Sequence, residues 1–422
     1  MLRVHSVSGE KLVTIDVASF LETLAIGCPP IRALKQHLRS LCGQPRFRQR
    51  LLLDGEVLDD EGMLKPGEVQ LVMLNFHPTT ELQMKGLRDA SKSGLTSGVE
   101  AILQRPQDPD LGEPTPLCVA SARSHLEVVG LLLEAKADKD KARDDGTTPM
   151  LVATHQGHLE VVRLLLEANA DRDKARDDGV TPLLMVAQNG HLEVVRLLLA
   201  ANACMDKAAH DGATPLFVAT HEGHLEVVRL LLDTNAAMDK ARGNSATALL
   251  MAAQEGRLEV VRLLLEAKAD IDKARDDGTS PLLVAAYQGH LETVRLLLEA
   301  NADKDKASKI GSVPLHFAAQ QGQLEVAKLL LRAKADKEKS RSDGATPLVM
   351  AAANGHLEVV HLLLGDNAAK AKATISAAHE GHPEVALLEA NADKDMGSEQ
   401  VGTPFVVAAE EVPLEVATLL SE

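Results

Sequence analysis

Apolar residues at helical spacing alternate with short polar stretches along most of this chain. In one representative copy, the apolar residues of Leu159–Leu166 cover more than one narrow stripe, which is typical of a helix packed between two neighbours. A shorter apolar run, Met150–Gln156, precedes it and follows Thr148-Pro149. Thr favours the N-cap and Pro the first turn, so this dipeptide predicts a helix start. The pattern therefore predicts two helices separated by Gly157, then a polar stretch that turns at Asp178-Gly179.

The two-helix pattern repeats at a fixed interval. Successive copies start 33 residues apart, at Pro116, Pro149, Pro182, Pro215, Ala248, Pro281, Pro314 and Pro347. A fixed period of this size is typical of stacked units that bury their apolar faces against each other. Because such an array grows without a new globular core, the length of 422 residues does not imply two or three separate domains.

The repeated residues resemble those of a known family. Most copies carry a version of the motif "DGxTPL…A…GHLEVVRLLLxxxAD", and on these residues the chain resembles the ankyrin repeat proteins, closely over residues 112–365 and loosely over 82–422. The resemblance implies pairs of antiparallel helices, hairpin-like fingers along one edge and a curved solenoid. It also implies binding of other proteins through the fingers and the concave helix face. We therefore expect a mainly α fold.

Within the array, residues 87–422, the ends should differ from the middle, because end units face solvent on one side. We expect four parts, namely an N-terminal cap repeat (87–111), eight regular repeats (112–371), a shortened repeat (372–398) and a truncated C-terminal repeat (399–422).

Two departures from the ankyrin pattern bear on local stability. The family has Gly where the second helix ends, whereas this chain has Asn or Lys there, as at Asn169 and Lys268. Asn accepts the left-handed conformation, but Lys in that conformation costs about 1 kcal/mol. The copy around Ala248 has Ser245 in place of the turn Gly, which predicts a looser finger.

The N-terminal 76 residues do not follow the period. Alternating apolar and polar residues predict a hairpin around Ser8-Gly9, and helical spacing predicts a helix over Pro30–Cys42 that stops at Gly43. Strands are predicted within Arg50–Leu58 and Val69–Leu74. This β-β-α-β-β order predicts a small α+β domain.

The order of these elements and the phrase "QRLLLDGEVLDDEGML" resemble a ubiquitin-like (β-grasp) domain over residues 1–76. By that resemblance, Leu52 and Val72 match two of the three apolar positions that ubiquitin receptors grip. The segment "LNFHPTT" has no Gly-Gly terminus, so the domain could not be conjugated as ubiquitin is. Residues 77–86 are then expected to link it to the array.

Composition narrows the classes of function and partner. The net charge is −16, and residues 1–76 carry equal numbers of basic and acidic residues, so the acidic excess belongs to the array. Nucleic acids and anionic membranes attract clustered basic residues, so we expect neither as a partner. The apolar runs are too short for a transmembrane segment. Without a signal-peptide pattern or a CxxC pair, the chain is expected to be cytoplasmic, with the nucleus as the alternative.

No residue pattern predicts catalysis or a cofactor. Two His stand three residues apart at His155 and His158, and twice more in the same register, but a metal site needs three or four converging ligands. The second His of each pair is expected to bond to its own turn. Cys118 and Cys204 are expected to be buried small residues. We therefore expect no catalytic residue, no metal, no cofactor and no enzyme activity.

Positions that vary between copies should carry the binding specificity. One series lies between the turn residue and Thr-Pro, and comprises Thr147, Val180, Ala213, Ala246, Thr279, Ser312 and Ala345. The other lies two residues before the helix-ending Gly, and comprises His155, Gln188, His221, Gln254, Tyr287, Gln320 and Ala353. Both are expected to line the face made by the fingers and the first helices. Interface hot spots favour Trp, Tyr and Arg, and these two series offer a single Tyr.

These observations predict a non-catalytic, monomeric adaptor or scaffold. The array is expected to bind a protein target, and the ubiquitin-like head to recruit a second partner from the ubiquitin–proteasome machinery. Two alternatives stay open. One is a structural tether or membrane-skeleton-type spacer, which near-identical repeats and an aromatic content of only 2% also fit. The other is an accessory substrate-binding subunit of a ubiquitin ligase.

Overall fold

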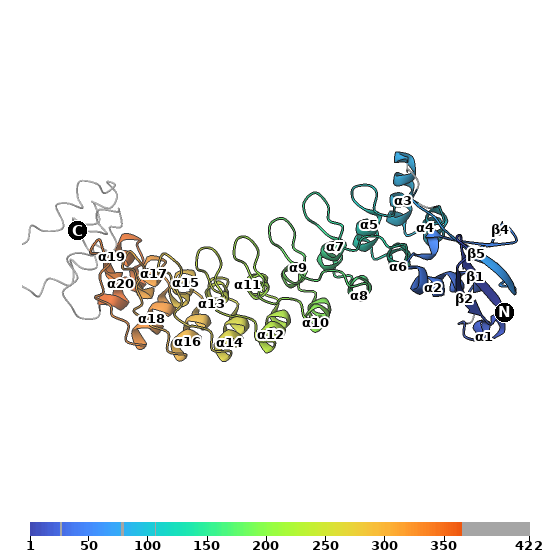
Figure 1. Cartoon of the computed structure of the whole chain (residues 1–422). Coiled ribbons are helices and arrows are strands. Elements are labelled where there is room, and N and C mark those ends of the chain that lie inside the picture. Colours follow the sequence, from blue (N-terminus) through green and yellow to red (C-terminus); the bar gives the residue numbers. More distant parts are fainter. Residues whose placement is uncertain (26–27, 77–79, 106, 365–422) are drawn as a thin grey trace, which may run out of the picture. The chain divides into compact units, whose positions relative to one another are not determined.

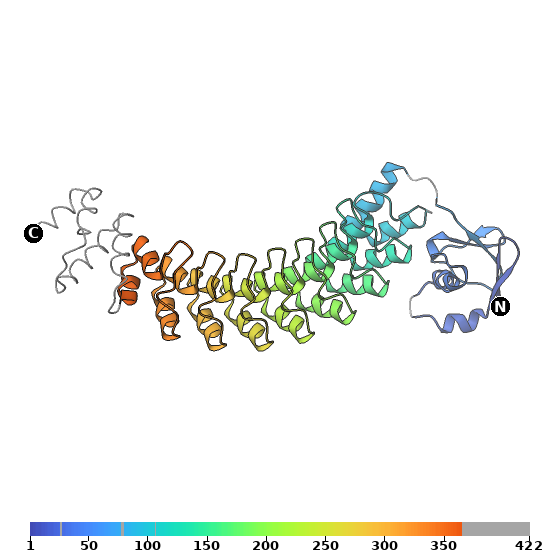
Figure 2. The ribbon, with the colours of Figure 1, turned by 60° about the vertical axis from the view of Figure 1, so that its left-hand side comes forward.

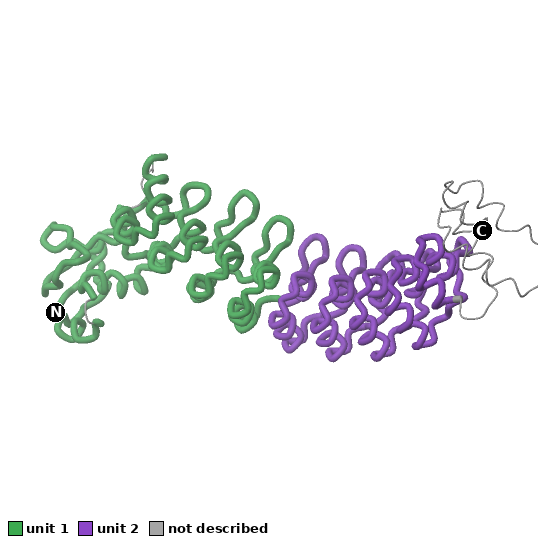
Figure 3. Tube along the Cα trace, turned by 180° about the vertical axis from the view of Figure 1, so that it is seen from behind, with its two compact units in different colours: residues 1–204 green, residues 205–422 purple. Residues whose placement is uncertain are grey.

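The computed structural model describes residues 1–25, 28–76, 80–105 and 107–364. The chain divides into two compact units, residues 1–204 and 205–422 (Figure 3). The first unit holds a small sheet domain and the N-terminal repeats, and the second unit continues the repeats. The predicted shortened and truncated repeats, 372–398 and 399–422, lie outside the described residues.

The N-terminal domain is built on a five-stranded mixed sheet. Its strands are β1 Leu2–Ser6, β2 Lys11–Ile15, β3 Gln49–Leu53, β4 Glu56–Val57 and β5 Gly67–Met73. They lie in the order β2-β1-β5-β3-β4, in which β1 and β5 are parallel and the other neighbours antiparallel. The predicted hairpin is confirmed, because β1 and β2 pair across a turn in which Gly9 has φ of 84°.

One long helix covers one face of this sheet. The domain's helices are α1 Val17–Glu22, α2 Pro30–Cys42 and the 3-10 helix η1 Arg46–Arg48. As predicted, α2 stops at Gly43, which has φ of 69°. Leu34 and Leu38 of α2 are buried in one apolar cluster with Leu51 and Leu71 of the sheet. The domain therefore has its own small core.

The remaining described chain is a series of helix pairs (Figures 1 and 2). The first helices of the pairs are α3 Glu81–Ser93, α5 Pro116–Ala122, α7 Pro149–Gln156, α9 Pro182–Asn189, α11 Pro215–Glu222, α13 Ala248–Gln254, α15 Pro281–Gln288, α17 Pro314–Gln320 and α19 Pro347–Ala353. The second helices are α4 Thr96–Leu103, α6 Leu126–Glu134, α8 Leu159–Glu167, α10 Leu192–Ala200, α12 Leu225–Asp233, α14 Leu258–Glu266, α16 Leu291–Glu299, α18 Leu324–Arg332 and α20 Leu357–Leu364. None of the helices in the described ranges is long and apolar enough to span a membrane.

The predicted helix ends are confirmed in detail. Thr148 caps α7, because its hydroxyl oxygen accepts a hydrogen bond from the Leu151 amide at 3.2 Å, with Pro149 in the first turn. Past the second helices, Asn169 has φ of 57° and Lys268 has φ of 66°. The Asn and Lys residues at this position therefore do adopt the left-handed conformation that usually selects Gly.

Two sets of side chains join successive repeats within each unit. Asp140 accepts a hydrogen bond from the Asp171 amide at 2.8 Å, and the same contact recurs from repeat to repeat, as between Asp305 and the Asp336 amide at 3.0 Å. The ring of His158 bonds to the carbonyl of Ala122 in the preceding repeat, at 3.2 Å. The prediction that this His bonds to its own turn is therefore wrong. The ring crosses instead to the neighbouring repeat.

The fingers also pair with each other. In the second unit, the Gly243 amide donates to the Asp211 carbonyl at 2.9 Å, and the Ser342 amide donates to the Ile310 carbonyl at 3.1 Å. The finger at Ser245 keeps the ordinary turn, because the Ser245 amide bonds to the Arg242 carbonyl at 2.8 Å, and Ser245 has φ of 61°. The predicted looser finger is not found, because Ser takes the left-handed position that Gly holds in the other fingers.

Candidate functional site

A hollow opens between the fingers and the first helices of the first unit. It has a volume of about 280 Å³ and lies against α5, α7, α9 and two consecutive fingers. Its lining is Ala122, Arg143, Thr147, Leu151, Val152, His155, Gln156, Arg176 and Met185. The described residues that line it include two arginines and no carboxylate. We refer to this hollow as the groove.

The two arginines occupy equivalent positions in successive fingers. The Nε atom of Arg143 is buried and has no hydrogen-bond partner. The backbone amide of Arg143 donates a hydrogen bond to the Thr147 carbonyl at 3.0 Å. Arg176 is held by Asp178 of its own finger, with Nε and Oδ1 3.0 Å apart. The hydrogen bond from Arg176 lowers the pKa of the Asp178 carboxyl. The groove edge therefore carries two arginines, each influenced by a finger aspartate, beside an apolar floor.

Arginine recurs at this finger position in the second unit, at Arg242, Arg275 and Arg341. Arg275 donates from Nη2 to Oε1 of Gln254 at 2.6 Å, and its Nε has no partner. Arg341 also has an unpartnered Nε and lies 3.0 Å from Asp343. Because these fingers repeat the same turn, each arginine lies where its finger meets the first helices.

The residues of the first predicted series lie between the turn of each finger and the first helix that follows it. Thr147 and Val180 are half-buried, and Thr147 lines the groove. Thr279 and Ala345 are also half-buried, whereas Ala213, Ala246 and Ser312 are buried. The buried members present little side chain to a partner.

The second predicted series is more accessible. His155, Gln188, His221 and Tyr287 are exposed, while Gln254, Gln320 and Ala353 are half-buried. His155 lines the groove, and Gln254 is the residue that holds Arg275. Tyr287 is 40% exposed and makes an edge-on contact with Phe317 at 5.6 Å between ring centroids.

The two residues predicted on the N-terminal domain lie on the sheet face opposite α2. In the antiparallel pair of β3 and β5, Arg50 is opposite Val72 and Leu52 is opposite Gln70. Leu52 and Val72 are therefore diagonal neighbours on one face, since side chains alternate along each strand. Both are half-buried, and Leu51 and Leu71 between them point into the core.

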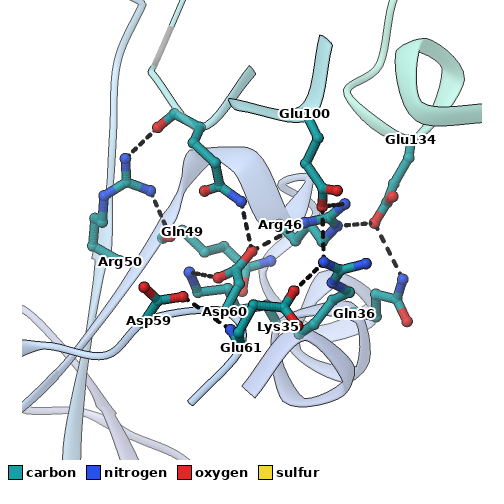
Figure 4. Close-up of polar contacts among 12 residues, drawn as sticks. Lys35, Gln36, Arg46, Gln49, Arg50, Asp59, Asp60, Glu61, Glu100 and Glu134 are labelled. Carbon is teal, nitrogen blue, oxygen red and sulfur yellow. Dashed lines mark hydrogen bonds and ion pairs between the residues drawn. The ribbon is translucent and has the colours of Figure 1, made fainter. Parts of the chain in front are cut away.

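A buried charge cluster joins the N-terminal domain to the first repeats (Figure 4). The side chain of Arg46 is 1% exposed and lies 3.0 Å from Asp60, 2.8 Å from Glu100 of α4 and 2.7 Å from Glu134 of α6. Asp60 is also paired with buried Lys35, and accepts from Gln104 at 2.8 Å. We call these contacts the junction cluster.

The charges in the junction cluster support one another. Burial lowers the pKa of Lys35, against the opposing effect of Asp60. Burial would raise the pKa of Asp60, but hydrogen bonds from Lys35 and Gln104 and the charges of Lys35 and Arg46 hold it below the ordinary value of 3.8. The contribution of Asp60 to stability is therefore present above pH 3.8 and is lost as the pH falls below it.

The remaining sequence predictions for chemistry concern metal binding and the two array cysteines, Cys118 and Cys204. Among the described residues, no group of three or more His, Cys, Asp or Glu side chains could hold a metal ion. Cys118 is buried, as predicted, but Cys204 is exposed, so the prediction for Cys204 is wrong. The backbone amide of Cys204 donates a hydrogen bond to the Asp173 side chain of the preceding repeat at 2.8 Å.

The stacked helix pairs, edge fingers and groove define a repeat scaffold, a class of protein that presents surfaces to other molecules. A family model described as "Ankyrin repeats (3 copies)" matches residues 87–175, 168–242, 233–308 and 303–375. Because these matches span more than half of the sequence, the chain belongs to the ankyrin repeat family, and ankyrin repeats imply protein–protein interaction. No curated protein matches the chain.

Sequence reasoning missed two parts of this surface. The finger arginines lie in the polar stretches that the sequence pattern predicted only to turn, as Arg176 does just before Asp178-Gly179. Their recurrence in five fingers, with Ala209 and Ser308 in two others, was the available signal. The junction cluster had no such signal, because Arg46 meets Glu100 and Glu134 only through the tertiary fold.

Proposed function

We propose that this chain is a non-catalytic adaptor that holds one protein in the groove and recruits a second through its N-terminal domain. The observation that carries the first half is the groove itself, with two arginines and His155 around an apolar floor of Leu151, Val152 and Met185. Binding sites in proteins combine apolar walls with a few convergent polar groups in this way.

The second half treats the N-terminal domain as a ubiquitin-like head. It is supported by the strand order β2-β1-β5-β3-β4 and by the shared sheet face of Leu52 and Val72. A component of the ubiquitin–proteasome machinery is the proposed partner of this face, and the adaptor is proposed to act as a monomer in the cytoplasm or the nucleus.

The test is affinity capture with the full chain, followed by identification of the captured proteins. The adaptor proposal expects Leu52→Ala with Val72→Ala to release one set of proteins, and His155→Ala with Val152→Ala to release another. Arg163→Ala, on the outer side of α8 in an exposed pair with Glu160, serves as the control. If one variant pair releases every captured protein, or neither releases any, the two-surface adaptor is wrong.

A further inference from the structure

The groove of the first unit also indicates the chemistry of what it binds. We propose that its occupant is an extended acidic segment of a protein partner, in which carboxylates about three residues apart pair with Arg143 and Arg176. This inference rests on the proposed function, because it assumes that the groove is a binding surface.

The donors at the groove edge are incompletely used. The buried Nε of Arg143 has no hydrogen-bond partner, but the Arg143 side chain is hydrogen-bonded to Cys118 and its charge acts on Asp145. Arg176 pairs with Asp178 of its own finger, where both side chains are substantially exposed, at 36% and 48%, and the charge of Asp145 in the neighbouring finger also acts on it. Exposed pairs of this kind contribute little, so an incoming carboxylate can replace one. A guanidinium holds a carboxylate through two parallel hydrogen bonds, which favours an acidic side chain over a neutral one.

The floor between the arginines indicates what lies between the carboxylates. Leu151, Val152 and Met185 line it, and no acidic side chain is among its described lining residues. An occupant with apolar residues between its carboxylates therefore satisfies both parts of the lining. A uniformly charged strand would leave the floor in contact with polar groups.

The spacing follows from the repeat. Arg143 and Arg176 belong to fingers that precede α7 and α9, which pack against each other. Packed helices have axes about 8–10 Å apart, and a chain in the polyproline II conformation advances about 3.1 Å per residue, with three residues per turn, so that residues three apart lie on the same side. The partner carboxylates that pair with successive arginines are therefore about three residues apart in the partner's sequence.

A protein segment fits better than a nucleic acid. The chain as a whole carries a net charge of −16, which repels a long polyanion. Exposed charges are screened beyond about 8 Å at physiological salt, so a short acidic segment responds mainly to the groove arginines. The second unit offers the same chemistry independently, where Arg275 lies beside Gln254.

The experiment is selection of peptides from an unbiased displayed library on the immobilised full chain, followed by fluorescence anisotropy of the selected peptides. The inference expects peptides with Asp or Glu at every third position and apolar residues between. Arg143→Gln and Arg176→Gln should each weaken binding about 3- to 10-fold, and salt should weaken it further. Arg163→Gln and Arg196→Gln, on the outer faces of α8 and α10, are matched controls that should leave affinity unchanged.

The outcomes separate this inference from the proposed function. Selected peptides that are basic or neutral, and that still depend on His155 and Val152, overturn the acidic partner but keep the groove. Peptides that no groove variant affects overturn both. A phosphoserine peptide or a single-stranded oligonucleotide that binds the groove more tightly than the best Glu peptide also overturns the inference, because the arginines then select phosphate.

Discussion

At the scale of single residues, the array depends on a few positions with unusual backbone conformations. Lys268 adopts the left-handed conformation with φ of 66° although it has a Cβ atom, and Gly157 adopts φ of 74° at the end of α7. These two positions differ in their surroundings. Lys268 is exposed at the surface, whereas a Cβ on Gly157 would lie 2.8 Å from the ring of His191 in the next repeat.

We expect Lys268→Gly to stabilise the protein by about 0.5–1 kcal/mol, because Gly relieves the left-handed strain at the cost of a more flexible unfolded chain. Lys268→Ala should leave the free energy of unfolding within about 0.5 kcal/mol, because Ala keeps the strain. Urea denaturation of both variants measures the difference. Equal stability of the Gly and Ala variants would show that the conformation carries no cost.

Gly157→Ala should destabilise the protein by about 2–3 kcal/mol. The left-handed backbone costs about 1 kcal/mol, and the displaced His191 ring also loses its hydrogen bond to the His155 carbonyl at 3.2 Å. Gly344→Ala is the control, because Gly344 has φ of 84° but nothing within 4 Å of its Cβ position. If both substitutions cost the same in urea denaturation, the His191 ring does not join the repeats.

At the scale of elements, the acidic residues of the fingers have a structural task. Asp140 and Asp239 each accept an amide hydrogen bond from the next repeat, so their carboxylates join neighbouring repeats. The first such residue, Asp110, accepts the Asp138 amide at 2.9 Å. Burial raises its pKa to about 6, with the nearby charges of Asp108 and Asp138 acting in the same direction.

The raised pKa of Asp110 predicts a specific pH dependence. The folded state binds the proton more tightly than the unfolded state, so this contribution to stability is full below pH 3.8 and is lost as the pH rises through about 6. Between pH 4 and pH 7 the wild-type protein should lose on the order of 1 kcal/mol of its free energy of unfolding through Asp110, since partial exposure weakens the effect. We expect the Asp110→Asn variant not to show this loss.

The measurement is the urea midpoint of the two proteins across that pH range. Asp140→Asn changes the equivalent carboxylate of the next repeat, and controls for the amide substitution itself. A wild-type and an Asp110→Asn profile that run parallel from pH 4 to pH 7 would contradict the assignment.

At the scale of the whole molecule, the N-terminal domain and the first repeats belong to one compact unit. The helix α3 starts at Glu81, inside the segment predicted as a linker, and its N-cap is Thr80. The junction cluster then ties the domain to α4 and α6 through Arg46. The N-terminal domain is therefore docked on the first repeats, and the groove and the Leu52 face belong to the same unit.

We expect Arg46→Met to destabilise the first unit by about 3–5 kcal/mol, because it leaves buried Asp60 and half-buried Glu100 and Glu134 without their shared cation. Hydrogen exchange should increase in α2, α4 and α6. Arg3→Met is the matched control, because its pair with Glu68 is exposed at 57% and 70%, and it should cost less than about 1 kcal/mol.

A second substitution tests the cause. Adding Glu134→Gln to Arg46→Met should restore part of the stability, because it removes one of the stranded charges. If the double variant is less stable than Arg46→Met alone, buried charge is not the reason for the loss.

Much of the fold follows from the sequence, because its determinants are local. The 33-residue period, the Thr-Pro helix starts and the residues at the helix ends each act within a few positions, and the structure confirms them. Most of the N-terminal domain was predictable for the same reason, since hairpin and helix signals lie within single segments, but the predicted β-β-α-β-β order lacked helix α1 and the short strand β4. The predicted binding series were less complete, because burial of Ala213 and Ser312 depends on neighbouring repeats.

Tertiary structure alone decided which distant residues meet. The His158 ring reaches the preceding repeat, Asp140 accepts an amide from the following repeat, and Arg46 draws together carboxylates up to 88 residues away. Spacing along the chain cannot encode these contacts, because electrostatic and hydrogen-bond energies depend on distance in space and on burial. The sequence by itself thus determined the repeating unit, and the packing of units decided which of its charges join neighbouring repeats and which arginines line the groove.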